Sequence, residues 1–264
     1  MEALASTLAV AARPRAFVRA SGPDAGDYLQ RMLSNDVAGL PVGGSCDALL
    51  LTSKARVVAP VRVWRRGEDD FLLLTEPELG EVLRSRLVAM RFAAKLELEP
   101  EEHSSVVVLG GDEGIPTHDY GEPAVEVLDG VVEPTIEPGE LERRRIAAGT
   151  PAWGKEIDDR VLPAEAGLVE RAVSLTKGCY PGQEPVARLH YRGHANRGLR
   201  RLRIETETPP NYDAELLYED KVVGRVTSAV PADGAVLALA YVRAEVPEDA
   251  ELRVGDAIAR PLDG

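Results

Sequence analysis

The chain has 264 residues, of which 28% are charged and 44% are hydrophobic, and it carries a formal net charge of -13 at pH 7. A chain of this length can bury a sizeable core, either in one large domain or in two to three small ones. No apolar run approaches the ~20 residues that a membrane-spanning helix needs, and the negative charge disfavours general nucleic-acid binding, which depends on clustered Lys and Arg. Cys46 and Cys179 are the only cysteines, too few for a disulfide framework, so we expect free thiols and a reducing cytoplasm.

Helical and strand-like patterns alternate in the first part of the chain. After Asp24, a residue type that often precedes helices, apolar side chains recur at helical spacing through residue 34 and predict a first helix. A second, amphipathic helix is predicted at 76–90. The strands predicted around these helices cover residues 46–51, 57–64, 71–74, 96–98 and 106–109. Helices between strands in this order predict an α+β body with ferredoxin-like layers.

The second part of the chain differs from the first in composition and in the spacing of its predicted elements. Residues 112–139 are rich in Gly, Pro and acids and are predicted as loops and short strands, and a helix at 140–148 is expected to end at Gly149. Short strand-like runs then follow one another at 199–204, 215–218, 221–228, 235–242 and 251–254. Regular short strands with Pro, Gly and Asp between them predict a small β-barrel or sandwich. We place a domain boundary near Asn196, with a body at 1–195, divisible into two subdomains, and a β-barrel domain at 196–264.

The octapeptide Lys177-Gly178-Cys179-Tyr180-Pro181-Gly182-Gln183-Glu184 is the most informative segment. Its Pro-Gly pair followed by Gln183 and Glu184 predicts a turn that opens a helix. A thiol acts as a nucleophile or metal ligand only as the thiolate, which a neighbouring cation or a helix N-terminus favours, and Lys177 and the helix start are the two candidates for this effect. The alternative is a cysteine packed as a small hydrophobe beside a tight turn, for which the polar neighbours are a poor setting.

A basic segment follows the octapeptide. From Arg188 to Arg203 the chain contains six arginines and two histidines but no acid. The segment is either a solvated face with structural arginines or a site for an anion. His190 and His194 would align only on a continuous helix, against which Gly193 argues, so we expect no metal site. Two cysteines cannot hold an iron–sulfur cluster within a monomer, so any cluster would be shared or transient.

These segments resemble a known family. The octapeptide, with Ala187-Arg188 and Tyr191-Arg192-Gly193 behind it, closely resembles the signature of the YgfZ-type folate-binding proteins, relatives of the aminomethyltransferase (T-protein) of the glycine cleavage system. Further similar segments, in family order over nearly the whole chain, are 22–30, 34–37, 143–151, Trp153-Gly154, Glu156-Ile157 and 162–168. The cysteine-containing signature is the specific part of the resemblance, since each of the other blocks is weak by itself.

The resemblance implies a fold, a cofactor and partners. The fold is a folate-binding, T-protein-like body with a small C-terminal β-barrel, and the cofactor is tetrahydrofolate or a one-carbon derivative of it. Iron–sulfur proteins or their assembly machinery are the implied partners, with neither nucleic acid nor membrane among them.

The resemblance also implies residues that hold the folate. Glu165 would accept hydrogen bonds from the amino group and ring N–H of the pterin, although it also fits a surface carboxylate in a first helical turn. Arg188 and Arg197 are candidates for binding the glutamate tail. Trp153 and Tyr191 are candidates for the pocket walls, although aromatic side chains are more often core residues.

One departure separates this chain from the aminomethyltransferases. Their catalytic carboxylate, which orients or deprotonates the reacting amine, lies in an Asp-Asp pair. The matching stretch here, 54–60, ends in Ala59-Pro60, and no Asp or Glu occurs between Asp47 and Glu68. We therefore expect the catalytic acid of the aminomethyltransferases to be absent.

The sequence favours a tetrahydrofolate-binding protein, a cytoplasmic monomer, that supports the assembly or repair of iron–sulfur proteins. In this interpretation Cys179, with Lys177 beside it, is the functional group. The alternative is a folate-dependent aminomethyl- or methyltransferase in which another residue does the work of the acid. A third possibility is a scaffold that binds a partner through its acidic surface and whose folate pocket is vestigial.

Overall fold

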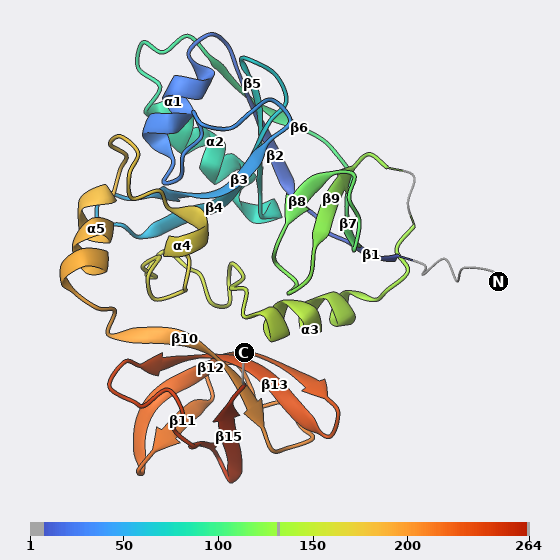
Figure 1. Ribbon diagram of the computed structural model, residues 1–264, viewed down its shortest axis with the longest axis vertical. Coiled ribbons are helices and arrows are strands. Elements are labelled where there is room, and N and C mark those ends of the chain that lie inside the picture. Colours follow the sequence, from blue (N-terminus) through green and yellow to red (C-terminus); the bar gives the residue numbers. More distant parts are fainter. Residues whose placement is uncertain (1–7, 131–132, 263–264) are drawn as a thin grey trace.

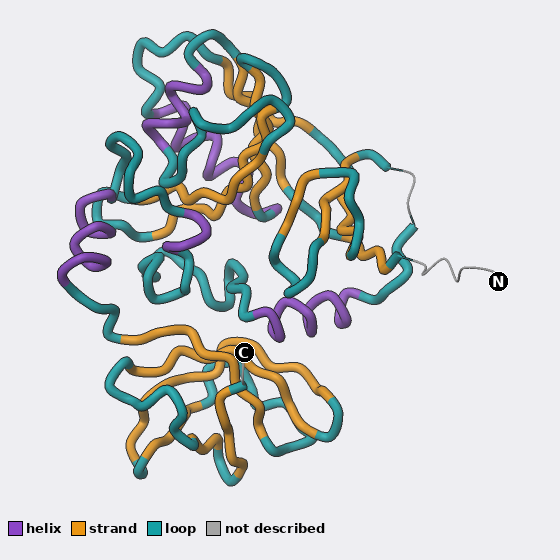
Figure 2. Tube along the Cα trace, viewed as in Figure 1, coloured by secondary structure: helices purple, strands orange, loops and turns teal. Residues whose placement is uncertain are grey.

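The computed structural model describes residues 8–130 and 133–262. Its elements form three groups: a five-stranded sheet with helices, a four-stranded sheet with one helix, and a closed barrel (Figures 1 and 2). The barrel lies at the bottom of these views, and the loops that follow α3 (Pro138–Ala148) run between it and the five-stranded sheet. Within the part of the chain that is described, no helix is both long and apolar enough to cross a membrane.

The five-stranded sheet has the order β3-β4-β5-β2-β6, and all its neighbouring strands are antiparallel. Its strands are β2 (Ala16–Ser21), β3 (Ser45–Leu51), β4 (Val57–Arg65), β5 (Asp70–Thr75) and β6 (Glu97–Glu101). The helices on one face are α1 (Ala25–Met32), η1 (Pro77–Leu79) and α2 (Gly80–Ala89). Leu29 of α1 and Leu83 of α2 are fully buried in a core with alternate strand residues such as Val63, which leaves the other face of the sheet for the rest of the molecule.

The four-stranded sheet is antiparallel and has the order β1-β7-β9-β8. Its strands are β1 (Ala9–Ala12), β7 (Ser105–Leu109), β8 (Ile115–Thr117) and β9 (Ala124–Leu128). Leu141 of α3 packs on Val107 and Leu109 of this sheet. α3 ends where the sequence predicts it, because Gly149 takes the left-handed conformation (φ 77°) and donates its N–H to the carbonyl of Ile146.

The first described residues join the two sheets. β1 pairs with β7 in one sheet and β2 pairs with β5 and β6 in the other, so the link 13–15 crosses between them. The sequence pattern missed both strands, because β1 is a four-residue, Ala-rich segment and β2 has an Arg within a six-residue segment of mixed residues. The link carries Arg13 and Arg15.

A histidine holds the turn that leads from β6 to β7. Nδ1 of His103 lies 2.6 Å from a carboxylate oxygen of Asp129, and Nε2 lies 2.9 Å from one of Glu101. Burial disfavours the charged imidazole, but the hydrogen bonds to Asp129 and Glu101 outweigh it and raise the pKa of His103. The turn thus adds a second link between the two sheets.

The C-terminal part is a closed, antiparallel six-stranded barrel of order β10-β13-β12-β11-β14-β15. Its strands are β10 (Arg197–Ile204), β11 (Glu215–Tyr218), β12 (Lys221–Ala232), β13 (Ala235–Arg243), β14 (Leu252–Val254) and β15 (Ala257–Pro261). Leu202, Val236 and Leu252 are fully buried in its interior. The α+β fold with a C-terminal β-barrel is therefore confirmed, although the sequence pattern missed β15. The domain boundary near Asn196 stays a prediction; in the structure, residues 193–196 link α5 (Gln183–Arg192) to β10.

Candidate functional site

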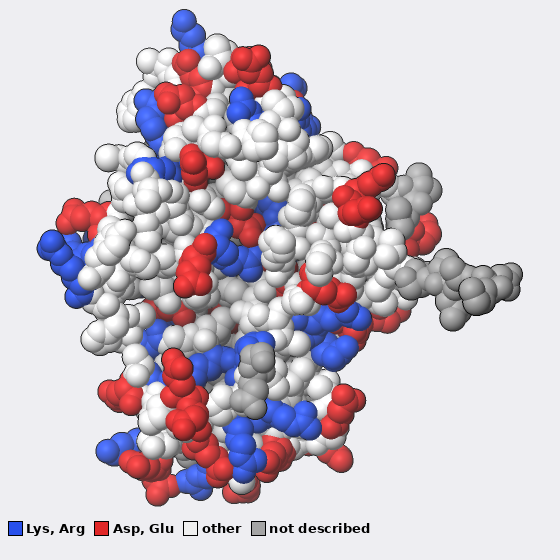
Figure 3. Space-filling model, in the orientation of Figure 1, with Lys and Arg blue, Asp and Glu red and all other residues white. Residues whose placement is uncertain are grey.

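A cavity of about 300 Å³ lies where the two sheets, α3, α4 (Val169–Ala172) and the segment 150–157 meet. In the space-filling view, the middle of the molecule is hollowed, and basic and acidic side chains lie next to one another there (Figure 3). The apolar part of the cavity wall includes Leu49, Pro60, Val61, Leu74, Trp153, Ile157 and Leu168, and charged side chains also line the space. A concave space that combines an apolar wall with polar groups at fixed positions is typical of a small-molecule site.

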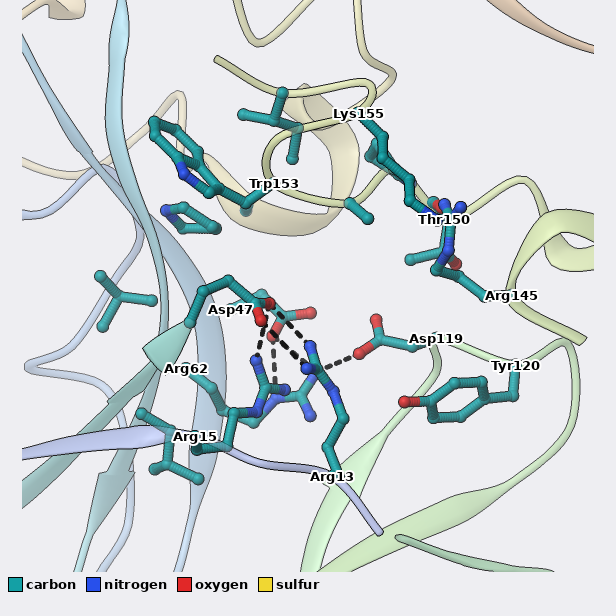
Figure 4. A pocket seen from close by; sticks show the side chains of 18 of the residues that line it. Arg13, Arg15, Asp47, Arg62, Asp119, Tyr120, Arg145, Thr150, Trp153 and Lys155 are labelled. Carbon is teal, nitrogen blue, oxygen red and sulfur yellow. Dashed lines mark hydrogen bonds and ion pairs between the residues drawn. The ribbon is translucent and has the colours of Figure 1, made fainter. Parts of the chain in front are cut away.

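Four charged side chains form a closed ring of ion pairs on this cavity, with Asp47, Arg62, Asp119 and Arg171 alternating in sign. Figure 4 labels Asp47, Arg62 and Asp119. Asp47 and Arg62 face each other across β3 and β4, 2.9 Å apart, and Arg62 reaches Asp119, in the loop between β8 and β9, at 3.3 Å. Arg171 of α4 closes the ring through an ion pair of 2.8 Å with Asp47 and a further one with Asp119. The ring fastens both sheets to α4, and we call it the ion-pair ring.

The ion-pair ring continues into a buried chain of charges. Arg62 also lies 3.4 Å from Glu126, Glu126 lies 2.5 Å from Arg15, and Glu76 binds Arg15 at 3.2 Å and Arg13 at 2.7 Å. Glu126 has a fully buried side chain, and its second oxygen has no hydrogen-bond partner in the described structure. Four guanidinium groups thus face four carboxylates, so the formal charges of this part of the site cancel.

The arginines favour the ionised forms of Asp119 and Glu76. Burial opposes the ionisation of Asp119, but the charges of Arg62 and Arg171 outweigh it and hold the pKa of Asp119 well below its usual range. Glu76 is similar, since the effect of its burial is exceeded by that of Arg13, which lowers its pKa. A general base works best with a pKa near the operating pH, so these carboxylates are poor bases. At the place expected for the catalytic acid, β4 brings Pro60 to the cavity wall.

A second polar cluster fixes the barrel beneath the cavity. The buried carboxylate of Glu156 accepts hydrogen bonds from Arg145 (3.0 Å), from the hydroxyl of Ser228 in β12 (2.6 Å) and from the N–H of Ala152 (3.0 Å). The hydroxyl of Tyr241 in β13 donates to the Glu156 carbonyl at 2.7 Å. Sequence reasoning noted Glu156 only as part of a similar segment and missed its role, which is to join α3, the segment 150–157 and the barrel.

The structure separates the five predicted folate-binding residues. Trp153 lines the cavity, and the other four residues are not among those that line it. Glu165 is held by Arg197 at 3.3 Å and accepts the N–H of Leu162 at 3.1 Å, which is the turn-stabilising role of the alternative interpretation. Arg188 pairs with Glu184 one helical turn away, and Tyr191 is 66% exposed. The structure therefore does not bring these five residues together at this cavity, and their part in binding a cofactor stays a prediction.

The basic segment after the octapeptide is largely bound within the protein. Arg200 donates to the carbonyls of Val246 and Pro247, Arg201 donates to that of Ala147, and Arg203 donates to that of Asp233. With Arg188 and Arg197 paired to glutamates, the structural interpretation is favoured over an anion site. α5 ends at Arg192, so His194 lies beyond the helix and cannot align with His190. Among residues 8–130 and 133–262, no cluster of three metal-binding side chains occurs.

The octapeptide forms the predicted turn and helix start. Gly182 has a left-handed conformation (φ 84°), and a Cβ there would lie 2.6 Å from the carbonyl oxygen of Thr52, so only glycine fits. α5 begins at the next residue, Gln183, whose side chain reaches the carbonyl of Lys177 at 3.5 Å. Cys179 is exposed as a free thiol in the turn before this helix. Tyr180 is buried beneath it, and burial raises the pKa of its hydroxyl to about 12.

The ammonium group of Lys177 donates to the carbonyls of Gln30, Leu33 and Asn35, at 2.5, 2.6 and 2.7 Å, which lie at the C-terminal end of α1. Its expected effect on the Cys179 thiol stays a prediction. Helix C-termini attract cations, so the lysine caps α1 and anchors the octapeptide to it. Burial lowers the pKa of Lys177 to about 8.

The other cysteine is the one electrostatically coupled to Lys177. Cys46 lies partly buried on β3, and its burial raises the pKa of its thiol to about 12, an effect that the positive charge of Lys177 only partly offsets. A thiol of this kind is protonated and unreactive near neutral pH. Of the two cysteines, Cys179 is therefore the accessible one.

The chain matches no family model, but it resembles several known proteins. It is 26% identical over 254 residues to an uncharacterized protein of Haemophilus influenzae, with 90% of each chain covered. It is 28% identical to the tRNA-modifying protein YgfZ of Edwardsiella ictaluri, with 90% of this chain and 85% of that protein covered. An aminomethyltransferase of Rippkaea orientalis is 25% identical over 86% of this chain, which spans only 50% of that protein.

A solved structure has the same architecture. The glycine cleavage system aminomethyltransferase T of Bartonella henselae superposes with a TM-score of 0.83 over 97% of this chain and 85% of that protein, at 20% identity. The protein therefore has the aminomethyltransferase fold. Within that class, the resemblance to the YgfZ-type, aminomethyltransferase-related proteins that the sequence predicts is confirmed by the relatives that carry these names.

Proposed function

We propose that this protein binds a reduced folate, tetrahydrofolate or a one-carbon derivative, in the cavity between its two sheets. The observation that carries the proposal is the cavity itself, which combines an indole wall at Trp153 with fixed charged groups in a fold shared with an aminomethyltransferase. A pterin is a flat heterocycle with N–H and amino donors beside a carbonyl acceptor. The indole ring suits stacking on such a heterocycle, and the ion-pair ring offers both acceptors and donors to its edge.

We further propose that the protein supports the assembly or repair of iron–sulfur proteins and that Cys179 is its functional thiol. The exposed position of Cys179, on a turn anchored from both sides by Lys177 and Gly182, supports this role. Three relatives are named tRNA-modifying proteins. A direct contact of this chain with tRNA is disfavoured by its net charge of -13 and by the internal bonding of most arginines between 188 and 203.

The cavity favours binding over transfer. Aminomethyl transfer needs a group that takes or orients a proton, but Pro60 occupies the expected place, and the cavity carboxylates Asp47 and Asp119 are each bound to two guanidinium groups. The folate would then serve as a bound cofactor or one-carbon carrier for a step that involves Cys179.

Calorimetric titration of the purified protein with 5-formyltetrahydrofolate tests the binding proposal, and the expected result is saturable binding of one molecule per chain. An assay with an aminomethyl-carrying lipoyl protein should give no methylenetetrahydrofolate. The absence of any heat of binding would exclude the folate proposal, and turnover in the second assay would favour the transferase.

The role of the thiol is tested in cells that lack the protein. Cys179→Ser should fail to restore the activity of an iron–sulfur enzyme, whereas the matched control Cys46→Ser should restore it. Full rescue by Cys179→Ser would remove the thiol from the proposed function.

A further inference from the structure

We propose that the exposed face of α5, together with the turn between β3 and β4, docks an acidic segment of the protein that Cys179 serves. This surface consists of Lys54, Cys179, Arg188, Tyr191 and Arg192, and we call it the thiol face. The proposal rests on the proposed function, because it gives the chemistry of the partner that reaches the proposed functional thiol.

α5 lies at the outer edge of the molecule and leaves most of its surface in solvent (Figure 1). Of its ten residues only Val186 is buried. Arg188, Tyr191 and Arg192 share one side of the helix, because residues three and four apart lie next to each other. All three are exposed, so this side of α5 is free to meet another molecule.

The turn between β3 and β4 brings a further cation to the octapeptide. Gly182 lies so close to this turn that a Cβ there would be 2.6 Å from the carbonyl oxygen of Thr52 and 3.0 Å from the Cα of Ala55. Lys54 lies between Thr52 and Ala55 in the chain, and it is exposed. Lys54 and Cys179 therefore occupy adjacent turns, although they are far apart in the chain.

The cations of the thiol face are available to a partner. The side chains of Lys54 and Arg192 have neither an ion pair nor a hydrogen bond within residues 8–130 and 133–262. Arg188 pairs with Glu184, but the two side chains are 68 and 84% exposed, and such ion pairs contribute little. Arg200, by contrast, is bonded within the protein, so it offers less to a partner.

Charge complementarity decides which partner the thiol face accepts. No acid occurs between Glu184 and Glu205, so the exposed side of α5 sets Arg188 and Arg192 against Glu184 alone. The whole chain carries a net charge of -13, which repels an acidic partner elsewhere and confines its approach to this face. Tyr and Arg are also enriched in protein interfaces, so Tyr191 offers an aromatic anchor beside the cations.

A protein segment fits this face better than RNA does. Nucleic acids are held by the neutralisation of many phosphates along an extended basic surface. The thiol face offers only Lys54, Arg188 and Arg192, and the acidic remainder of the protein would repel the rest of a long polyanion. A segment with a few carboxylates meets only the local charges.

The test measures thiol–disulfide exchange between Cys179 and two synthetic peptides. Each peptide carries one cysteine as its 2-pyridyl disulfide, flanked by glutamates in the acidic peptide and by glutamines in the neutral one. The Cys179 thiolate attacks the peptide sulfur, a mixed disulfide forms, and pyridine-2-thione leaves and is followed by its absorbance. In Cys46→Ser protein at low ionic strength, the acidic peptide should react roughly tenfold faster than the neutral one, and added salt should reduce this advantage. Equal rates would overturn the proposal.

Variants then assign the advantage to residues. Lys54→Gln with Arg192→Gln should lower the ratio of the acidic to the neutral rate by roughly threefold or more, and Glu184→Gln should raise it. This ratio cancels any change in the reactivity of the thiol itself. The matched control, Arg86→Gln with Lys221→Gln, removes the same charge from two exposed cations elsewhere and should keep the ratio. An equal loss in both pairs, or a loss in neither, would mean that the thiol face does not select the peptide.

Transfer RNA tests the other class of partner. Fluorescently labelled, unfractionated tRNA should show no binding to the thiol face by anisotropy at physiological salt. Binding that Lys54→Gln with Arg192→Gln abolishes, and that blocks the reaction of the acidic peptide, would assign the face to RNA and overturn the proposal.

The failure of the docking proposal can be distinguished from that of the proposed function. In cells that lack the protein, replacement of Lys54, Arg188 and Arg192 by glutamate should prevent rescue of an iron–sulfur enzyme, although Cys179 is retained and still reacts with the neutral peptide. If this variant rescues while Cys179→Ser fails, the thiol keeps its role and the docking proposal falls. If Cys179→Ser rescues fully, the proposed role of the thiol falls, and the docking proposal falls with it.

Discussion

Replacing Glu156 with Gln should loosen the barrel from the rest of the molecule. The carboxylate of Glu156 is fully buried and bonds to Arg145, to Ser228 of the barrel and to the N–H of Ala152. The amide keeps the shape of the side chain but removes its charge, and its NH2 group cannot accept. Either the hydroxyl of Ser228 or the pair formed by Arg145 and the N–H of Ala152 therefore loses its acceptor. The guanidinium of Arg145 is left buried with only Glu142 as its anionic partner.

The size of the effect follows from burial. Breaking a buried ion pair by removing one partner costs about 3–5 kcal/mol, and we expect the lower end, about 3 kcal/mol, because Gln retains one acceptor and Arg145 retains Glu142. For a chain of this size each kcal/mol lowers the melting temperature by roughly 2–4 °C, so the midpoint should fall by roughly 6–12 °C.

Glu142→Gln is the matched control for this experiment. Glu142 also binds Arg145, but its side chain is 28% exposed, and an exposed ion pair contributes at most about 1 kcal/mol. Thermal unfolding followed by circular dichroism gives both midpoints, and limited proteolysis of the link 193–196 reports detachment of the barrel. If the Glu156 variant melts within about 3 °C of the wild type, or no lower than the control, the buried cluster does not hold the barrel as argued here.

Three further outcomes can be measured. Iodoacetamide near neutral pH should modify Cys179 at least about tenfold faster than Cys46, whose pKa is raised by burial to about 12; similar rates by peptide mass spectrometry would contradict the structure. Lys177→Met should leave the pH dependence of Cys179 alkylation unchanged but expose the turn at 174–182 to proteolysis, because the lysine caps α1; a shift of that pH dependence to higher pH would mean that the lysine activates the thiol. The folded-state pKa of His103 is raised, so its ion pairs stabilise the protein fully below the unfolded value near 6.5, and this contribution is lost as the pH rises through the folded value. Between about pH 6 and about pH 9, the wild type should lose roughly 0.5–1 kcal/mol more stability than His103→Gln, and identical urea denaturation profiles for the two proteins would refute this.

Local patterns in the sequence predicted many of the helices and strands, because the turns and helix ends that bound these elements are encoded by neighbouring residues. The barrel strands are short segments separated by turns, and the octapeptide opens α5 as expected. α3 ends at Gly149, whose left-handed conformation favours glycine. The strands β1 and β2 were missed because they are short and are stabilised by partners some 50–100 residues away along the chain, which a local pattern does not contain.

The site was harder to predict than the fold. The members of the ion-pair ring are spread from Asp47 to Arg171, and only the three-dimensional arrangement brings them together. One signal was available, since Asp47 and Arg62 interrupt otherwise apolar strands with opposite charges. The contact of Lys177 with α1 was not predicted, because the position of a residue along the chain does not say where a long side chain reaches.

The way β1 and β2 enter the two sheets sets the order in which the protein can fold on the ribosome. β1 pairs with residues 106–109 and β2 with residues 70–75 and 97–101, so both wait for later strands. At a synthesis rate of about 5–20 residues per second, β1 stays unpaired for roughly 5–20 s. The cavity is completed later still, when Trp153 and Arg171 have emerged. A cofactor in this cavity is therefore captured by a finished body and cannot act as a template for the nascent N-terminal half.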